Sequence, residues 1–152
     1  MRVHRFEAEQ RVQRPLAEVF DFFSRASNLE AITPPWLQFS LAGDPGEVET
    51  GTEITYRMKV HGVPVKWVSR IDEFERDRQF VDRQLTGPYR LWIHRHEFTP
   101  DGDATLVRDL LRYQLPLGVL GGLAHVFFVE RDVRQIFEYR REAIERLLEG
   151  HS

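Results

Sequence analysis

The sequence contains no cysteine, so disulfide bonds, a thiolate nucleophile and a cysteine-based zinc site are all excluded. It also lacks any run of roughly 18 consecutive apolar residues, the length that a membrane-spanning helix needs. The first residues do not form the apolar region of a signal peptide. We therefore expect a soluble, cytoplasmic protein without stable membrane insertion.

No excess of basic charge is present either, since the formal net charge is -3. Without a basic surface we expect no nucleic-acid partner. Glycines occur in the segment 116–122, but it lacks the Gly-x-Gly-x-x-Gly spacing and the Lys-Ser/Thr pair of phosphate-binding loops. We predict that this segment is a flexible lid or the entry to a helix. The few serines lie in no nucleophile elbow, so a Ser-His-Asp hydrolase is not indicated.

The sequence does contain a repeated strand pattern. In a chain of 152 residues, 41% of them hydrophobic, one core is expected, and we predict a single domain over residues 1–152. Apolar and polar residues alternate with the period of two that is typical of half-buried strands. The predicted strands cover residues 3–12, 37–41, 54–60, 63–71, 80–85, 89–98 and 105–114.

Three helices are predicted between and after these strands. Residues 15–23 carry apolar side chains at helical spacing, and Pro15 suits the first helical position. Asn28 is expected to cap a second short helix that ends before two consecutive prolines. Residues 123–149 form one long amphipathic helix whose apolar stripe includes Phe137. This order predicts an α+β fold in which the last helix lies across a curved antiparallel sheet.

Three segments carry a family resemblance beyond this order of elements: residues 28–36, 87–98 and 109–118. With them the chain resembles the START-like (SRPBCC) helix-grip superfamily, in particular bacterial proteins grouped with polyketide cyclase/dehydratase and coenzyme Q-binding proteins. The resemblance implies about seven strands, two short helices and a cavity between the concave sheet face and the terminal helix. Members of the superfamily carry, sequester or transform different hydrophobic molecules. No universal catalytic residue is carried over from them.

Polar side chains on neighbouring strands form the main candidate site. If the loop 87–89 is a three-residue turn, Asp82 lies opposite His94, because antiparallel partners have a constant index sum. If His96 faces Val107 in the next hairpin, His94 lies opposite Asp109. A histidine between two carboxylates is expected to stay protonated to a higher pH than usual.

Several interpretations of the row Asp82, His94 and Asp109 stay open. On the outer face it is a solvated charge ladder, and on the inner face it is a satisfied polar cluster, a ligand anchor or a proton-transfer site. His94 and His96 also point the same way and, with Asp109, offer metal-ligand chemistry. Nothing else in the sequence clusters with them, so we expect neither a metal nor a cofactor.

A small-molecule cavity of the expected kind has an apolar wall from which a few polar side-chain groups project. Arg70 is one candidate polar tip, and the apolar segment 115–129 is a candidate for pocket lining, membrane contact, subunit pairing or core packing. The residues that we predict to contact a ligand are Tyr56, Trp67, Asp82, Gln84, Trp92, His94, Asp109, Leu111, Tyr113 and Phe137.

Three functional hypotheses follow. The first is binding or transport of a hydrophobic or aromatic small molecule, such as a lipid, quinone or polyketide-like compound. The second is a cyclase or dehydratase in which His94, with Asp109 or Asp82, transfers protons. The third is an interaction module with a vestigial cavity, whose segment 115–129 docks a protein or makes transient contact with a membrane. The sequence does not fix the ligand, the presence of a reaction or the oligomeric state.

Overall fold

The structure is a computed structural model that describes residues 3–116 and 123–150, without the side chains of residues 123–127. Its sheet has seven strands in the order β1-β7-β6-β5-β4-β3-β2, and all neighbouring strands are antiparallel. The elements are β1 (His4–Val12), α1 (Leu16–Phe23), η1 (Ala26–Asn28), α2 (Leu29–Ile32), η2 (Pro35–Leu37), β2 (Ser40–Leu41), β3 (Glu53–Val60), β4 (Val63–Glu75), β5 (Gln79–Thr86), β6 (Leu91–Asp101), β7 (Ala104–Gln114) and α3 (Leu123–Glu149).

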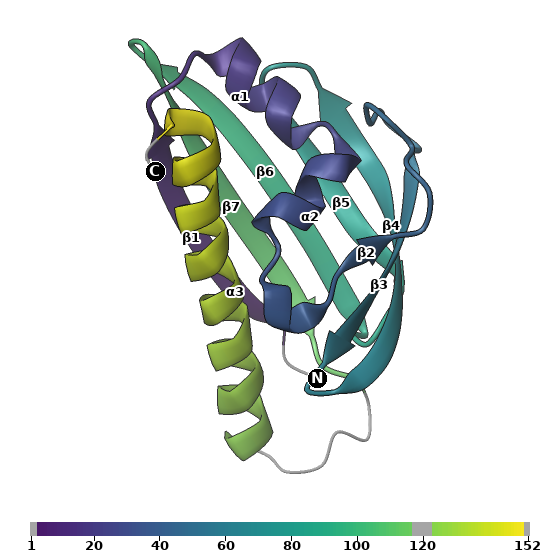
Figure 1. Cartoon of the computed structure of the whole chain (residues 1–152). Helices are drawn as coiled ribbons and strands as arrows, with labels where there is room; N and C mark the ends of the chain where they lie inside the picture. Colours follow the sequence, from purple (N-terminus) through teal and green to yellow (C-terminus); the bar gives the residue numbers. More distant parts are fainter. Residues whose placement is uncertain (1–2, 117–122, 151–152) are drawn as a thin grey trace.

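The helices lie over one face of the curved sheet (Figure 1). The helix α3 runs beside β1, while α1 lies over one end of the sheet, where it contacts β6 and β7, and α2 lies next to α3 (Figure 1). The carboxyl end of α3 is held to the loop after β1, because the Arg14 side chain donates a 2.6 Å hydrogen bond to the carbonyl of Leu148. This arrangement confirms the predicted α+β, helix-grip fold.

Local sequence explains the hairpins and the curvature. Residues His61 and Gly62 both have positive φ angles, 50° and 81°, which is the backbone that a tight two-residue hairpin between β3 and β4 requires. Between β4 and β5 the strand register shifts twice, at Val68/Ser69 and at Ile71/Glu73. Such bulges bend the strands and increase their twist, so the sheet becomes a concave surface that can enclose a cavity.

Aromatic side chains form much of the core at the end of the sheet covered by α1. Phe20 on α1 is fully buried and packs edge-on against Phe74, Phe80 and Phe98, with ring centroids 5.4, 6.2 and 5.0 Å away. On α3, the predicted stripe is buried at Val133, Phe137, Ile144 and Leu148. These contacts fix the helices on the sheet at one end, whereas the other end stays hollow, as described below.

Three local predictions were wrong. Residues 37–41 form only the short β2, because η2 precedes it and Gln38 adopts a left-handed conformation with φ 48°. Asn28 does not cap α2; its side-chain amide instead donates to the Phe22 carbonyl at 2.7 Å. In the β6–β7 hairpin His96 lies opposite Asp109, because the strands continue to Asp101 and Ala104 and the turn is centred on Gly102 and Asp103, one residue later than the predicted pairing requires.

Predictions for the segment 116–122 largely fall outside the described residues, as does the placement of the side chains of residues 123–127. The proposed roles of these residues as a lid, a pocket lining or a contact surface therefore stay predictions. None of the described helices is long and apolar enough to cross a membrane.

Candidate functional site

A cavity of about 1380 Å³ lies between the concave face of the sheet and the helices. Strands β3 to β6 supply one wall and α3 supplies another, because their inward side chains alternate along each strand and recur along the helix. Polar groups at its wall include Asp82, His94, His96 and Arg140. Most of the lining is apolar or aromatic and includes Phe23, Leu29, Ile54, Tyr56, Met58, Trp67, Ile71, Phe80, Tyr89, Trp92 and Phe137.

The cavity is open to solvent on the side where two of its aromatic lining residues are exposed. Trp36 is 55% and Phe128 is 49% exposed, although both line the cavity. The tip of the β3–β4 hairpin reaches α3 at this point, because the His61 ring lies 2.7 Å from the Asp132 carboxylate and 4.6 Å, between centroids, from the Phe128 ring. The hairpin and the helix are thus linked across the opening.

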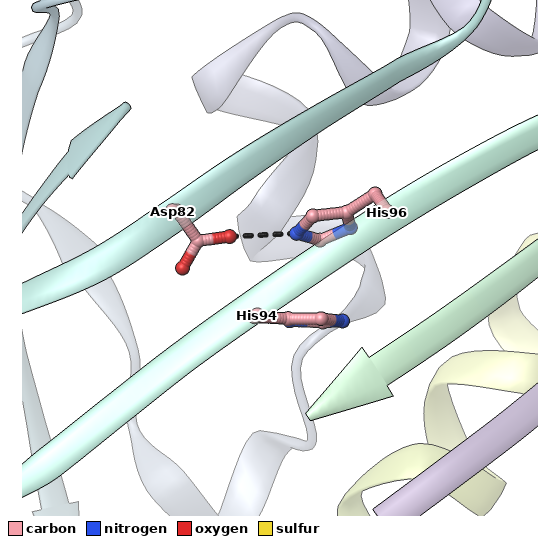
Figure 2. Close-up of side chains that lie close together, drawn as sticks. All are labelled: Asp82, His94 and His96. Atoms are coloured by element: carbon pink, nitrogen blue, oxygen red, sulfur yellow. Dashed lines mark hydrogen bonds and ion pairs between the residues drawn. The ribbon is translucent and has the colours of Figure 1, made fainter. Parts of the chain in front are cut away.

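Two histidine–aspartate pairs form a buried polar cluster on the inner face of the sheet. The Nε2 atom of His96 donates to the Asp82 carboxylate at 2.6 Å, and the Nε2 atom of His94 donates to the Asp109 carboxylate at 2.7 Å. Figure 2 shows that the two imidazole rings, both on β6, are stacked, and that Asp82 reaches them from β5. The ring centroids are 3.7 Å apart. The predicted row therefore exists and faces the interior.

Register explains why the partners are exchanged. Asp82 lies opposite His94 in the β5–β6 pair, as predicted, but its carboxylate bonds to His96, one step further along β6. Likewise Asp109 lies opposite His96 and bonds to His94. Both bonds are diagonal, because residues two apart on a strand share a face and each aspartate can reach the histidine next to the one that it lies opposite. The predicted direct opposition of His94 and Asp109 was wrong, but the contact between them is present.

Arg140 is the cationic member of the cluster, and the sequence analysis missed it. Its Nη2 atom lies 3.5 Å from His96 Nδ1 and 3.8 Å from the Asp109 carboxylate. The guanidinium lies over the rings of Phe23 and Phe137, at 5.5 and 5.7 Å from their centroids. Its Nε atom is buried and has no hydrogen-bond partner among the described residues. Its position in the sequence could have indicated this role, since residue 140 comes three residues after Phe137 and so lies on the apolar stripe of the helix.

Burial and Arg140 determine the charges in this cluster. Burial, together with the neighbouring His94 and Arg140, lowers the pKa of His96 to about 4, although the hydrogen bond to Asp82 opposes this shift. The neutral imidazole fits the geometry, because Nε2 donates to Asp82 and Nδ1 accepts from Arg140. At His96, burial and the nearby cationic side chain therefore outweigh the effect of the two carboxylates.

Both carboxylates of the cluster stay ionised. Burial alone raises the pKa of Asp109, but Arg140 and the hydrogen bond from His94 outweigh it and hold that pKa well below its usual range. In Asp82, burial is likewise outweighed by the hydrogen bond from His96, so its pKa is also lowered. Burial raises the pKa of the Tyr56 hydroxyl, which therefore serves only as a neutral hydrogen-bonding group.

The predicted ligand contacts divide into two groups. The six that line the cavity are Tyr56, Trp67, Asp82, Trp92, His94 and Phe137. The other four are not among the described residues that line it. Asp109 lies behind His94; Leu111 and Tyr113 are buried in β7; and the Gln84 amide is bonded to the backbone carbonyl of Tyr89 at 2.6 Å.

Arg70 lies on the outer face of the sheet and not in the cavity. Its guanidinium bonds to Asp72 at 2.8 Å, next to Arg83, which bonds to the same carboxylate. Asp72 and Arg70 are two residues apart on β4, so they share a face, which is opposite to that of Ser69 and Ile71. The suggestion that Arg70 is a polar tip inside the pocket was therefore wrong.

The cluster also contains a set of potential metal ligands. Asp82, His94 and His96 each offer one ligand atom, and these three atoms lie within 4.8 Å of one another. The sequence analysis had considered Asp109 as the third ligand. In the structure Asp109 instead accepts the hydrogen bond from His94, while Asp82 completes the set from the neighbouring strand.

A comparison with protein-family models gives one match to most of the chain. The model described as polyketide cyclase / dehydrase and lipid transport matches residues 12–144. A search of curated proteins found no match.

Solved structures with the same fold include an aromatase/cyclase. The Zhui aromatase/cyclase from Streptomyces sp. R1128 is 18% identical, with a TM-score of 0.77 over 97% of this chain and 94% of that chain. A START superfamily protein from Mycobacterium smegmatis is 15% identical, with a TM-score of 0.73 over 97% and 98% of the two chains. Major latex-like protein 151 from Panax ginseng is 10% identical, with a TM-score of 0.69 over 96% and 97%. At these identities the likeness concerns the fold.

Proposed function

The chain belongs to the polyketide cyclase / dehydrase and lipid transport family, and we propose that it binds or carries a hydrophobic or aromatic small molecule in the cavity. Lipids, quinones and polyketide-like compounds are the classes that suit it. The observation that carries this proposal is a cavity of about 1380 Å³ whose mainly apolar and aromatic wall also contains polar groups. This combination is typical of small-molecule sites.

The size of the cavity favours an extended or polycyclic ligand. Typical pockets for drug-sized molecules measure roughly 300–1,000 Å³, so this cavity exceeds what a single small ring fills. Each 100 Å² of apolar ligand surface removed from water contributes about 2.5 kcal/mol before the costs of binding are subtracted. The aromatic rings of Tyr56, Trp67 and Trp92 supply this apolar surface.

The polar cluster gives the ligand an orientation. His94, His96 and Asp82 form a polar cluster in the sheet wall of a mainly apolar cavity, so a ligand hydroxyl or carbonyl group placed there avoids the cost of an unpaired buried polar group. Gln135, Glu138 and Glu142 of α3 also line the cavity but are exposed. The Trp67 indole already donates to Ser69 at 2.9 Å. We therefore expect the oxygen atoms of the ligand to lie at the sheet beside β5 and β6.

Fluorescence titration tests the proposal with Nile red, a neutral apolar dye. Met58 lines the cavity, whereas the neighbouring Lys59 is exposed, so the two positions form a matched pair on β3. Met58→Asp should weaken dye binding at least about tenfold by placing a charge in the apolar wall, and Lys59→Asp should leave it unchanged. A chain that does not bind Nile red, and whose native mass spectrum shows no co-purified small molecule, would contradict the proposal.

A second candidate function is catalysis of a cyclase or dehydratase type. It is favoured by the hydrogen bond from His94 to Asp109, because this carboxylate orients an imidazole at the cavity wall as a general base requires. In a dehydration, His94 would take the proton from the carbon beside a ketone. The β-hydroxyl group would then leave as water after accepting that proton, and a carbon–carbon double bond would form.

The two functions differ in their response to one substitution. If the protein only binds its ligand, His94→Ala should change the affinity for Nile red by less than about tenfold. Under the enzymatic function, the same variant should lose turnover of a β-hydroxyketone, followed by the absorbance of the conjugated product. Wild-type protein without measurable turnover would leave binding as the function.

The third hypothesis, an interaction module, predicts a filled interior, and the volume of the cavity counts against it. Transient contact with a membrane surface and location in the cytoplasm stay predictions from the sequence. Binding to Nile red and to lipid vesicles, measured separately, distinguishes a cavity function from a surface function.

A further inference from the structure

We propose that Asp82, His94 and His96 form a binding site for a divalent transition metal ion in the wall of the cavity, with Asp109 as the group that orients the histidines. The three side chains come from two adjacent strands, and one ligand atom of each lies within 4.8 Å of the other two. Figure 2 shows Asp82 beside the stacked rings of His94 and His96. This site goes beyond small-molecule binding and does not depend on it.

The hydrogen bonds identify the nitrogen atom that each histidine offers. Nε2 of His94 donates to Asp109 at 2.7 Å, so its remaining nitrogen, Nδ1, carries the free lone pair. Nε2 of His96 faces Asp82 at 2.6 Å, and a metal ion would replace the proton between these two atoms. That proton would move to Nδ1 of His96, which would then stop accepting from the Arg140 guanidinium, 3.5 Å away, and donate to the Asp109 carboxylate, 3.7 Å away.

Asp109 therefore has the position of an outer-sphere carboxylate for both histidines. One oxygen atom of Asp109, Oδ1, is the nearest carboxylate atom to His94 Nε2 and to His96 Nδ1. Carboxylates in this position fix the ring orientation and the tautomer of metal-binding histidines and raise their basicity. Arg140 approaches the same oxygen at 3.8 Å and His96 Nδ1 at 3.5 Å, so its charge lies beside the cluster and helps to keep Asp109 ionised.

Metal binding requires only small side-chain movements. Ligand atoms about 2.0–2.2 Å from a tetrahedral ion are roughly 3.3 Å apart, so atoms within 4.8 Å of one another need to approach by about 1.5 Å at most. The ring of His94 is stacked at 3.7 Å on that of His96, and a rotation of the two rings would bring their nitrogen atoms toward Asp82. The strand backbone can stay in place, since residues 94 and 96 already share a face of β6.

The ligand set and its charge indicate the class of ion. Two imidazoles and one carboxylate suit Zn²⁺, Fe²⁺, Co²⁺ or Ni²⁺, whereas Mg²⁺ and Ca²⁺ prefer oxygen ligands only. Among the described charged side chains that contact the cluster, the carboxylates of Asp82 and Asp109 outnumber the guanidinium of Arg140. Three protein ligands at a cavity wall leave coordination positions open for an oxygen atom of a bound molecule.

Titration with Co²⁺ alone tests the site. The full chain, free of any histidine tag and treated with a chelator, should take up one equivalent of Co²⁺ and develop the visible absorption of the four- or five-coordinate ion. His96→Ala and Asp82→Asn should each weaken binding by about 100-fold or more, and Asp109→Asn by about 10- to 100-fold with the same spectrum. His61→Gln, which alters an exposed histidine outside the cluster, should have no effect.

The wild-type chain also provides a test that does not depend on the folding of variants. On addition of Zn²⁺, the imidazole nitrogen resonances of His94 and His96 should shift, and those of His61 should not. Absence of stoichiometric Co²⁺ uptake by the wild type would overturn the proposal. It would also be overturned if His61→Gln weakened binding as much as His96→Ala does, or if Zn²⁺ shifted resonances outside the cluster instead.

Discussion

Acidification should destabilise the fold through His96, whose imidazole is buried and neutral in the native state. Its pKa is lowered from the ordinary value of 6.5 to about 4, first by burial and then by His94 and Arg140. Between these two pH values the unfolded chain binds a proton at residue 96 and the folded chain does not. Stability is therefore greatest above about pH 6.5 and falls as the pH drops toward 4.

The size of this effect follows from the width of the pH window. One pKa unit corresponds to about 1.4 kcal/mol, so a shift from 6.5 to about 4 gives a loss on the order of 3 kcal/mol. Asp82 and Asp109 do not contribute in this window, because their pKa values are lowered and their stabilisation is lost only as the pH falls below the ordinary range of a carboxyl group.

Urea unfolding between pH 7.5 and pH 4.5, in the presence of a chelator that removes metal ions, measures this loss. His96→Gln is the matched variant, since its amide group can still donate a hydrogen bond to Asp82 and does not titrate. We expect the unfolding free energy of the wild type to fall steadily from pH 7.5 to pH 4.5. The fall in His96→Gln should be smaller than that in the wild type by about 2–3 kcal/mol.

The result that would refute the reasoning is equal pH dependence in the two proteins. In that case the pKa of His96 would be the same in the folded and the unfolded chain, and neither burial nor Arg140 would determine the charge of its ring. A titration of the His96 ring by NMR in the folded protein gives an independent value, and an apparent pKa near 6.5 would contradict the argument directly.

Three further predictions concern other parts of the molecule. Phe20→Ala should lower the unfolding free energy by about 3–5 kcal/mol, because Phe20 is fully buried among aromatic rings; a loss below about 1 kcal/mol in urea unfolding would contradict the described packing. Asp132→Ala should lower the unfolding free energy by less than about 1 kcal/mol, because its partner His61 is half exposed, but it should release Nile red faster in stopped-flow dilution by freeing the hairpin from α3. Arg140→Met should raise the pKa of His96, since the guanidinium lowers it; an unchanged NMR titration of His96 would show that Arg140 does not act on this ring.

Much of the fold could be predicted because its signals are local. The alternation of residues in β1, where Arg5, Glu7 and Glu9 are exposed, and the helical stripe of α3 follow from the geometry of a strand and a helix. The failures were also local, at turns and caps. Gln38 adopts a left-handed conformation, and no pattern of hydrophobicity indicates that.

The candidate site was predicted only in part. The index sum across a hairpin placed Asp82 opposite His94 correctly, since the predicted centre of the turn between β5 and β6 was right. It failed for β6 and β7 by two residues because the turn is centred on Gly102 and Asp103, one residue later than the predicted pairing requires. Arg140 was missed altogether, because an arginine within an apolar stripe is normally expected to extend its charged end to water.

The sequence by itself determined the order of strands and helices along the chain and the presence of titratable side chains on β5, β6 and β7. Only the tertiary structure decided that the sheet bends enough to leave a cavity, that the histidine–aspartate bonds run diagonally, and that Arg140 lies against Asp109 and His96. The physical reason is that periodicity depends on bonds within one element. Cavity volume, burial and the pKa of His96 depend on side chains that are distant in the chain and meet only when α3 packs over the sheet.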